Sequence, residues 1–425
     1  MIPIQPPFQL LPTYRPIAFE AKVTILDTVG PAENALVTIN KGGVDVVLSI
    51  PYKSIRNEPA LAPGFTDYYF DIDIQKYCQD LLGPFAALPS IFPSKTDMSA
   101  QNNELFDYFY IKVSYQYISL ADGLLKTIPV GDISNSYCVF AASRKNQELM
   151  SLEDYLGTTP ITPDRLFLTK SARVLNVCED DNAFLSVLQE DGTVPTNGIS
   201  ASFYDSSGAL LDFGLAFLPS PTIAGQLTVN TGLDSLANMT WVLGAPVLPN
   251  PLIASYVLTF GSITVTGGPT YSYLRQTEDF TYNVINHCCD RKSLRLHWMN
   301  LLGGADSYTF DENKDLQIAT NHSTGQKALG WIAGSTSPNI ASDIGSMKLK
   351  SEGLRFYNLN SKILTNAQSL WLSEMLTSPK VYAQINGDFI AVIVEKTTQS
   401  IGRDKGKIRF PITVTLANDL IIQRS

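Results

Sequence analysis

The sequence predicts a mainly β protein, built from several antiparallel β-sandwich or barrel units with one or two short helices. Segments rich in Val, Ile, Tyr, Phe and Thr recur along the chain, and some alternate between the two faces of a strand, as residues 108–115 do. Turn signals such as Gly42-Gly43 and Asp122-Gly123 separate these segments at a spacing typical of sandwiches. The 425 residues are enough for about three domains of ordinary size.

The first predicted domain covers residues 14–150 and follows an extended N-terminal arm, residues 1–13. Prolines at Pro3, Pro6, Pro7 and Pro12 hold the arm extended, and we expect it to lie against another subunit. Strands are predicted at 14–28, 35–55, 105–119 and 124–142. Apolar residues at helical spacing predict one short helix at 71–82.

A second β-sandwich domain is predicted at 164–288, after a polar linker near 143–163. Its strand patterns lie at 200–205, 208–218 and 225–229. A loop is expected at 243–252, and a single long strand at 271–285.

The third predicted domain, 289–425, carries the clearest local signals. Thr365 and Gln368 form the pattern of a capping box, which predicts a helix at 366–377. Asn386-Gly387 predicts a two-residue type I′ hairpin over 381–395, with one face on that helix and the other on the closing sheet or a neighbouring subunit. A final strand is predicted at 407–416. Before it, Arg403 and Lys405 form either a solvated turn or an electrostatic contact to a neighbouring copy.

The composition of the chain limits the classes of partner that it can bind. The net charge is −9 and the sequence pI about 4.9, which argues against duplex DNA or an anionic membrane as the main ligand. Charged residues make up only 17 % of the chain, which suits a protein that covers much of its surface with neighbours. No segment approaches the ~18–20 apolar residues of a membrane span. The N-terminus lacks a basic region, so we expect no secretion signal. The five cysteines have no framework spacing and are expected to be reduced thiols.

Catalytic and metal-binding motifs are missing from the sequence, so we predict no enzyme activity, no cofactor and no metal. His287 beside Cys288-Cys289 lacks the two spaced pairs of a structural zinc site. Asp311-x-Asn313-x-Asp315 imitates the start of a calcium loop, but the later positions do not fit. The acidic run 179–181 is expected to be a solvated loop.

Three stretches carry a resemblance to a known class of protein. The first runs from Cys288 to Phe310 and contains the pattern hydrophobic-x-Trp-hydrophobic-Asn-x-x-Gly-Gly, followed by an aromatic residue and Phe. The second is the C-terminal helix, hairpin and closing strand, and the third is the segment 70–79. The residues that carry the first pattern are Trp298, Asn300, Gly303, Gly304 and Phe310.

These stretches resemble virion structural proteins of tailed bacteriophages that infect Bacteroidetes, crAss-like phages included. The resemblance implies a tail, neck or baseplate component that forms homo-oligomeric rings of six or twelve copies. It implies other virion proteins as partners, a place in the virion after synthesis in the host cytoplasm, and no catalytic residue. It also implies that Trp298 fills a core and that Gly303-Gly304 permits a sharp turn.

The sequence therefore predicts a structural protein that acts through subunit assembly, without sequence-specific nucleic-acid binding and without a membrane. The alternative is a receptor- or glycan-binding β-sandwich module of a virion or cell surface. A polysaccharide hydrolase is a third possibility, because a pair of catalytic carboxylates need not be close in sequence. The mass of the native assembly distinguishes a ring from a monomeric sugar-binding module.

Overall fold

The computed structural model confirms the predicted fold class: the chain is mostly β, arranged in several antiparallel sheets. The chain divides into two compact units, each made of three chain segments. Unit 1 contains 1–174, 182–284 and 300–305, and unit 2 contains 175–181, 285–299 and 306–425. The structure describes residues 10–12, 18–26, 28–41, 43–56, 65–74, 76–77, 93, 99–102, 106–128, 136–140, 155, 165–189, 196–218, 225–244, 246–248, 250–267, 270–285, 293–311, 313–326, 346–395 and 409–424.

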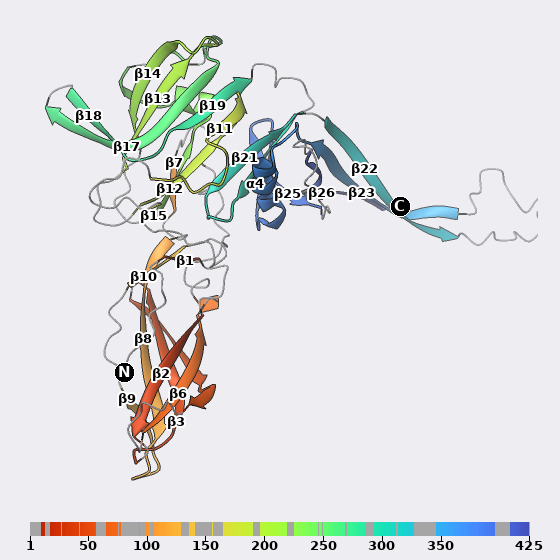
Figure 1. The fold of residues 1–425 in the computed structure, drawn as a ribbon. Coiled ribbons are helices and arrows are strands. Elements are labelled where there is room, and N and C mark those ends of the chain that lie inside the picture. Colours follow the sequence, from red (N-terminus) through yellow and green to blue (C-terminus); the bar gives the residue numbers. More distant parts are fainter. Residues whose placement is uncertain are drawn as a thin grey trace, which may run out of the picture. The chain divides into compact units, whose positions relative to one another are not determined.

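An N-terminal β-sandwich opens unit 1 (Figure 1). One sheet has the order β1-β10-β8-β3-β4, with β9 on β8, and the other has the order β2-β6-β5. Buried aliphatic and aromatic residues of both sheets, among them Val37, Phe70 and Tyr115, form one core. The strands are β1 (Leu10–Pro12), β2 (Ala18–Leu26), β3 (Ala32–Lys41), β4 (Val44–Pro51), β5 (Ser54–Arg56), β6 (Phe65–Asp73), β8 (Phe106–Ile118), β9 (Leu125–Ile128) and β10 (Ser136–Phe140).

Two predictions in this region are corrected. The helix predicted at 71–82 does not begin at Asp71, because β6 continues to Asp73 and places Ile72 in the core. Lys76 and Tyr77 are helical, and the rest of the predicted helix lies outside the described residues. The end of the N-terminal arm is also a strand, since β1 pairs in parallel with β10 of the same chain, Leu11 opposite Val139.

A second sandwich contains a seven-stranded sheet of order β11-β19-β17-β13-β14-β16, with β18 on β17, and a three-stranded sheet β12-β15-β7. Its strands belong to unit 1 except for β11, most of which unit 2 includes. Tyr256 and Tyr282 stack in its core, where both hydroxyls hydrogen-bond to Thr231. The elements are β7 (Ser99–Asn102), β11 (Val174–Cys178), β12 (Phe184–Gln189), β13 (Gly198–Tyr204), β14 (Leu210–Phe217), β15 (Gly225–Asn230), α3 (Leu233–Ala237), β16 (Trp241–Leu243), β17 (Ser255–Gly267), β18 (Thr270–Arg275) and β19 (Phe280–Ile285).

The single strand predicted at 271–285 is wrong. It is two strands, β18 and β19, because the chain bends at Gln276-Thr277, where both backbone N–H groups donate to the carbonyl of Phe260. β17, the central partner of both strands, was not predicted. Cys178 is disulfide-bonded, which corrects the expectation that the cysteines are reduced.

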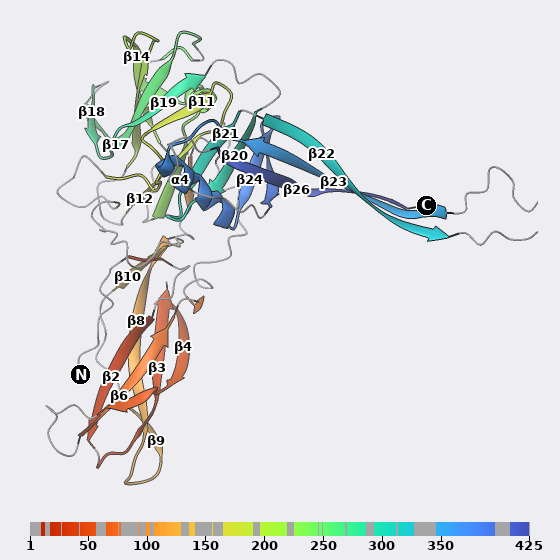
Figure 2. The same cartoon turned by 45° about the vertical axis from the view of Figure 1, so that its right-hand side comes forward.

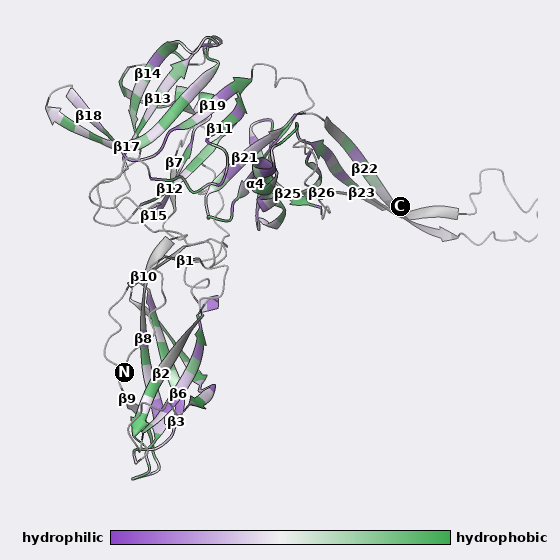
Figure 3. Ribbon diagram, in the orientation of Figure 1, coloured by the Kyte–Doolittle hydropathy of each residue, from purple (hydrophilic) through white to green (hydrophobic). Residues whose placement is uncertain are grey.

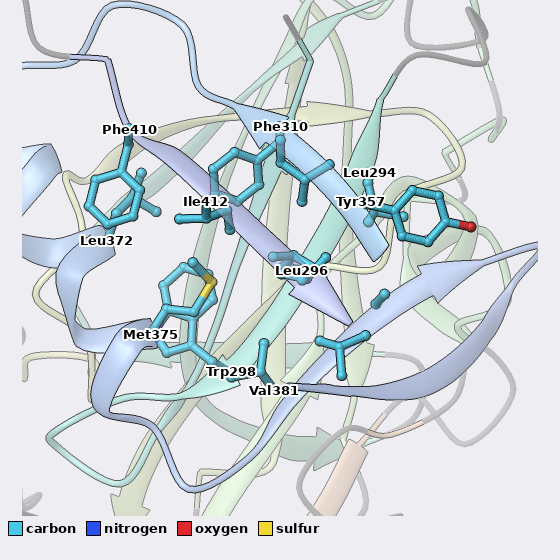
Figure 4. Close-up of a cluster of buried hydrophobic side chains, with 14 of the residues drawn as sticks. Leu294, Leu296, Trp298, Phe310, Tyr357, Leu372, Met375, Val381, Phe410 and Ile412 are labelled. Carbon is cyan, nitrogen blue, oxygen red and sulfur yellow. The ribbon is translucent and has the colours of Figure 1, made fainter. Parts of the chain in front are cut away.

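Unit 2 is built on a seven-stranded sheet of order β21-β20-β24-β25-β26-β23-β22, with one long helix (Figure 2). Its core gathers aromatic and aliphatic residues of the sheet around Trp298, with Leu372 and Met375 from the helix (Figure 4). The elements are β20 (Leu294–Met299), β21 (Ala305–Phe310), β22 (Asn313–Gln326), β23 (Ser346–Asn360), α4 (Asn366–Thr377), β24 (Val381–Ile385), β25 (Asp388–Val394) and β26 (Pro411–Arg424).

The two strongest local predictions are confirmed. The helix α4 begins at Asn366 behind a capping box, in which Thr365 Oγ1 accepts from the Gln368 backbone N–H and Gln368 reaches back to Thr365. The hairpin β24–β25 turns at Asn386-Gly387, with φ of 54° and 91°. The final strand begins at Pro411 rather than 407 and continues to Arg424, and β22 and β23 were not predicted as strands.

Candidate assembly surfaces

The residues of the first resemblance form a buried hairpin and its turn. Trp298 and Phe310 are completely buried, on β20 and β21. Asn300 organises the turn: its side-chain Oδ1 accepts from the backbone N–H groups of Leu302 (2.9 Å) and Gly304 (3.0 Å). Its Nδ2 donates to the carbonyl of Leu168 at 2.6 Å. The turn is therefore fixed from within and from a distant segment.

Gly303 and Gly304 meet different requirements in this turn. Gly303 has φ of +82°, a left-handed conformation that favours glycine, and its carbonyl accepts from Gln226 Nε2 at 2.8 Å. At Gly304 a Cβ would stand 2.1 Å from the carbonyl oxygen of Leu168, so only a hydrogen fits. Both residues serve packing, and neither lies on an accessible surface.

A buried polar layer lies on the opposite face of β20. Arg295 Nη1 donates to Asp181 Oδ2 at 2.9 Å, and the same oxygen accepts from Thr309 and from the backbone N–H of Cys178. His297 Nδ1 lies 2.8 Å from Ser307 Oγ, and its Nε2 lies 3.3 Å from Gln384 Oε1. Burial, with the charge of Arg295, lowers the pKa of His297 well below its usual value. Because His297 is fully buried, the His297–Ser307 pair has no access to a substrate and serves the fold.

The long ribbon made by β22 and β23 is the first accessible surface that stands out. The two strands run side by side beyond α4 in both views (Figures 1 and 2). On one face Leu316 and Ile318 are 52 % and 55 % exposed. On the other face Leu354 is exposed opposite Ala319. β22 is also the outermost strand of its sheet, so its outer backbone groups have no strand partner among the described elements.

The second surface is the face of the unit 2 sheet that points away from α4. The hairpin row Ile390, Val392 and Val394 packs on the core beneath α4, as predicted for one face. The alternate row leaves Ile393 58 % exposed, beside Thr415 in the register of β25 and β26.

The third surface, at one end of the N-terminal sandwich, was not predicted. The tight β8–β9 turn exposes Leu120 (63 %), Leu124 (62 %) and Leu125 (55 %). Figure 3 shows hydrophobic segments at this end. Within the turn, hydrogen bonds from Lys126 and Ser119 to Asp122 lower the pKa of its carboxyl to about 2. The sequence signal was the presence of leucines on both sides of the Asp122-Gly123 turn.

Several residues that the sequence singled out do not belong to these three surfaces. Pro3, Pro6, Pro7, Arg403, Lys405 and His287 lie outside the described residues. Asn313 to Asp315, part of the calcium-like pattern, begin strand β22, and Asp311 pairs with Lys362. Among the described residues no group of three or more His, Cys, Asp or Glu is placed to hold a metal ion. None of the described helices has the length and apolar character needed to cross a membrane.

No family model matches the chain, and no curated protein matches it. The case for function therefore depends on the surfaces themselves.

Proposed function

We propose that the protein is a structural component of a tailed-phage virion, in the tail, neck or baseplate, and acts by assembling with copies of itself and with other virion proteins. The observation that supports this most is the β22–β23 ribbon, which carries exposed apolar side chains on both faces. β26 pairs with β23 from Lys350 to Asn360, so the ribbon is the edge of the unit 2 sheet, yet Leu316, Ile318 and Leu354 remain exposed there. Packing against a neighbouring subunit would bury these apolar side chains.

The outer edge of β22 supports the same proposal. Proteins usually protect an exposed edge strand with Lys, Pro or other charged residues, because unpaired backbone groups pair with other chains. From Leu316 to Gln326, β22 contains no Lys, Arg, Asp, Glu or Pro. An edge without such protection is suited to strand pairing between subunits.

The resemblance of the segment 288–310 to phage virion proteins supplies the biological setting, and the low proportion of charged residues agrees with it. In this proposal the ring contains six or twelve copies, the buried hairpin β20–β21 is scaffold, and the ribbon is a contact between neighbours. The protein performs no catalysis.

Native mass spectrometry of the full chain tests the proposal. The wild type is expected to form a closed ring, and the double variant Leu316→Lys, Ile318→Lys is expected to remain monomeric at the same concentration. Val47→Lys is the matched control, because Val47 is 59 % exposed on β4, an edge strand of the N-terminal sandwich, and is expected to leave the ring intact. A wild type that stays monomeric up to tens of micromolar overturns the proposal.

A further inference from the structure

One face of the second sandwich has a composition unlike that of the surfaces above. The register of the seven-stranded sheet places Ser200, Ser202 and Tyr204 of β13 on the side away from the core. Their neighbours on this side are Ser255 of β17, opposite Tyr204, and Asn283 of β19, opposite Ser255. Thr281 of β19 lies beside Val257, which is opposite Ser202. We call these six polar residues the hydroxyl face: Ser200, Ser202, Tyr204, Ser255, Thr281 and Asn283.

The opposite side of the same strands is the sandwich core. Phe203, Tyr256 and Tyr282 are buried there, and their rings contact one another. The alternation of side chains along each strand therefore separates a dry aromatic face from the hydroxyl face.

The side chains of the hydroxyl face are accessible and make no side-chain hydrogen bonds to other described residues. Asn283 is exposed and the other five are half-buried. None of the six makes a side-chain hydrogen bond within the part of the chain that the structure describes, whereas Thr259, next in the same array, bonds to the hydroxyl of Tyr273. Each hydroxyl offers one donor and two acceptor positions, and the Asn283 carboxamide offers both kinds of group. The face is a cluster of free hydrogen-bonding groups.

Neutrality is the second property of this face. The outward positions of β13, of β19 and of β17 from Ser255 to Gly261 contain no Lys, Arg, Asp or Glu, and those of β14 from Phe213 to Phe217 are apolar. An anionic polysaccharide or nucleic acid requires basic side chains, but Arg275 of β18, opposite Gly261, is paired with Asp279, and the net charge of −9 repels anionic ligands further. The ligand that complements this face is therefore uncharged and rich in hydroxyl groups.

The composition also argues against a protein partner on this face. Serine is depleted in protein–protein interfaces, while Arg, Met and Trp are enriched. Here three of the six positions are serine. Tyr204 instead provides one aromatic ring, and Phe213, on the strand next to Ser202, provides a second, 36 % exposed. An aromatic ring has a negative face that attracts the polarised C–H groups of a sugar ring.

From these observations we propose that the hydroxyl face binds a neutral oligosaccharide, a function separate from subunit assembly. Adjacent strands lie about 4.8 Å apart and same-face residues along a strand about 6.7 Å apart, so the face measures roughly 10 by 13 Å. That area accommodates a short oligosaccharide lying flat. Tyr204 and Phe213 bind the apolar side of the sugar rings, and the serines, Thr281 and Asn283 bind the ring hydroxyls. A flat site buries little of its ligand, so the expected Kd is about 0.1–1 mM.

Titration calorimetry of the full chain with cellohexaose, maltohexaose, xylohexaose and mannohexaose tests the proposal. At least one is expected to bind, and Ser202→Glu and Tyr204→Ala are each expected to weaken binding at least tenfold. Ser272→Glu is the matched control, because Ser272 is exposed on β18 of the same sheet at a position that points away from the hydroxyl face, and it is expected to bind as the wild type does. Thermal melting checks that Ser202→Glu remains folded.

Two results overturn the proposal. The first is that none of the four hexasaccharides binds. The second is that one binds with the same affinity to wild type, Ser202→Glu and Tyr204→Ala, which would place the site elsewhere. If Ser202→Glu changes the native mass while no saccharide binds, the hydroxyl face is a subunit contact.

Discussion

The side-chain Nδ2 of Asn300 donates a hydrogen bond of 2.6 Å to the backbone carbonyl of Leu168, which is 132 residues earlier in the chain. The same carboxamide accepts two backbone N–H groups of its own turn through Oδ1. One buried side chain thus joins a local turn to a remote segment. Its chemistry explains why the pattern requires Asn at this position, since Asn supplies a donor and an acceptor together.

Asn300→Ala is expected to lower the free energy of unfolding by about 3 kcal/mol or more, because it leaves three buried backbone groups without that partner, at roughly 1–3 kcal/mol each. Urea unfolding followed by tryptophan fluorescence measures the change. Asn238→Ala, which removes one exposed hydrogen bond to the carbonyl of Asp234, is the control and is expected to cost little. Equal effects of the two variants would show that the turn is not anchored by Asn300.

Trp298→Ala is expected to lower the free energy of unfolding by about 3–5 kcal/mol, the usual range for emptying an aromatic core site. Trp298 is fully buried, and its ring centroid lies 5.3 Å from that of Trp371. A finer comparison uses phenylalanine. The Trp298 Nε1 has no hydrogen-bond partner in the described structure, whereas the Trp371 Nε1 donates to Asp306 at 2.6 Å. Trp371→Phe is therefore expected to destabilise the protein more than Trp298→Phe. Thermal melting of the two variants at the same protein concentration compares them. An unchanged melting temperature for Trp298→Ala would place this motif on the surface.

Stability is expected to fall as the pH drops below about 6.5, because the lowered pKa of the buried His297 keeps it neutral in the folded protein while it binds a proton in the unfolded chain. Above that pH, His297 is neutral in both the folded and the unfolded protein, and its full contribution to stability is present. It is lost at about 1.4 kcal/mol per pH unit below it, until the folded pKa is reached. Urea unfolding of wild type and His297→Gln at several pH values between 8 and about 5 isolates this contribution. The difference between the two proteins should shrink toward acid pH, and parallel pH profiles would exclude His297 as its source.

Two deletions separate the roles of the N-terminal arm. Removing residues 1–9 leaves β1 in place, while removing residues 1–13 also uncovers the edge of β10. If the arm contacts a neighbouring copy, both deletions are expected to weaken assembly, and only the longer one is expected to lower the melting temperature. Native mass and thermal melting are measured on the same samples. Normal assembly of both truncated chains would refute a role for the arm.

Charge reversal at Arg403 and Lys405 tests the basic turn before the final strand. If this turn contacts an acidic face of the next copy, the double reversal to Glu is expected to weaken assembly most at low ionic strength, where charges are least screened. The measurement is the mass distribution across a salt series. An unchanged salt dependence would assign the turn to solvent.

Local signals were sufficient for α4 and the β24–β25 hairpin, because a capping box and an Asn-Gly turn act within a few residues. The segment after Phe70 was harder to assign. In residues 71–82 the same apolar residues fit both a strand and a helix, and Ile72 and Ile74, two residues apart, are both buried. The strand period applies up to Asp73 because β2 is there to pair with it, opposite Ala18. Pairing between distant segments decides such cases.

The ribbon and the hydroxyl face were missed for another reason. β22 is exposed on both of its faces over much of its length, so its sequence lacks the alternation that marks a half-buried strand. The hydroxyl face combines three residues of β13, one of β17 and two of β19, strands that are separated by tens of positions in the sequence. The disulfide at Cys178 likewise depends on a pairing that cysteine spacing alone does not reveal.

The ion pair between Asp181 and Arg295 has a consequence for synthesis on the ribosome. Arg295 follows Asp181 by 114 residues, which corresponds to roughly 6 to 23 s of translation. Throughout that interval the nascent chain carries the carboxylate without the guanidinium that later neutralises it. Since unit 2 includes both 175–181 and the C-terminal segments, a recombinant fragment that starts at residue 285 lacks one of its own pieces. Such a fragment would leave Arg295 buried without its counter-ion, and it should require a synthetic peptide spanning 175–181 to restore its native fold by complementation.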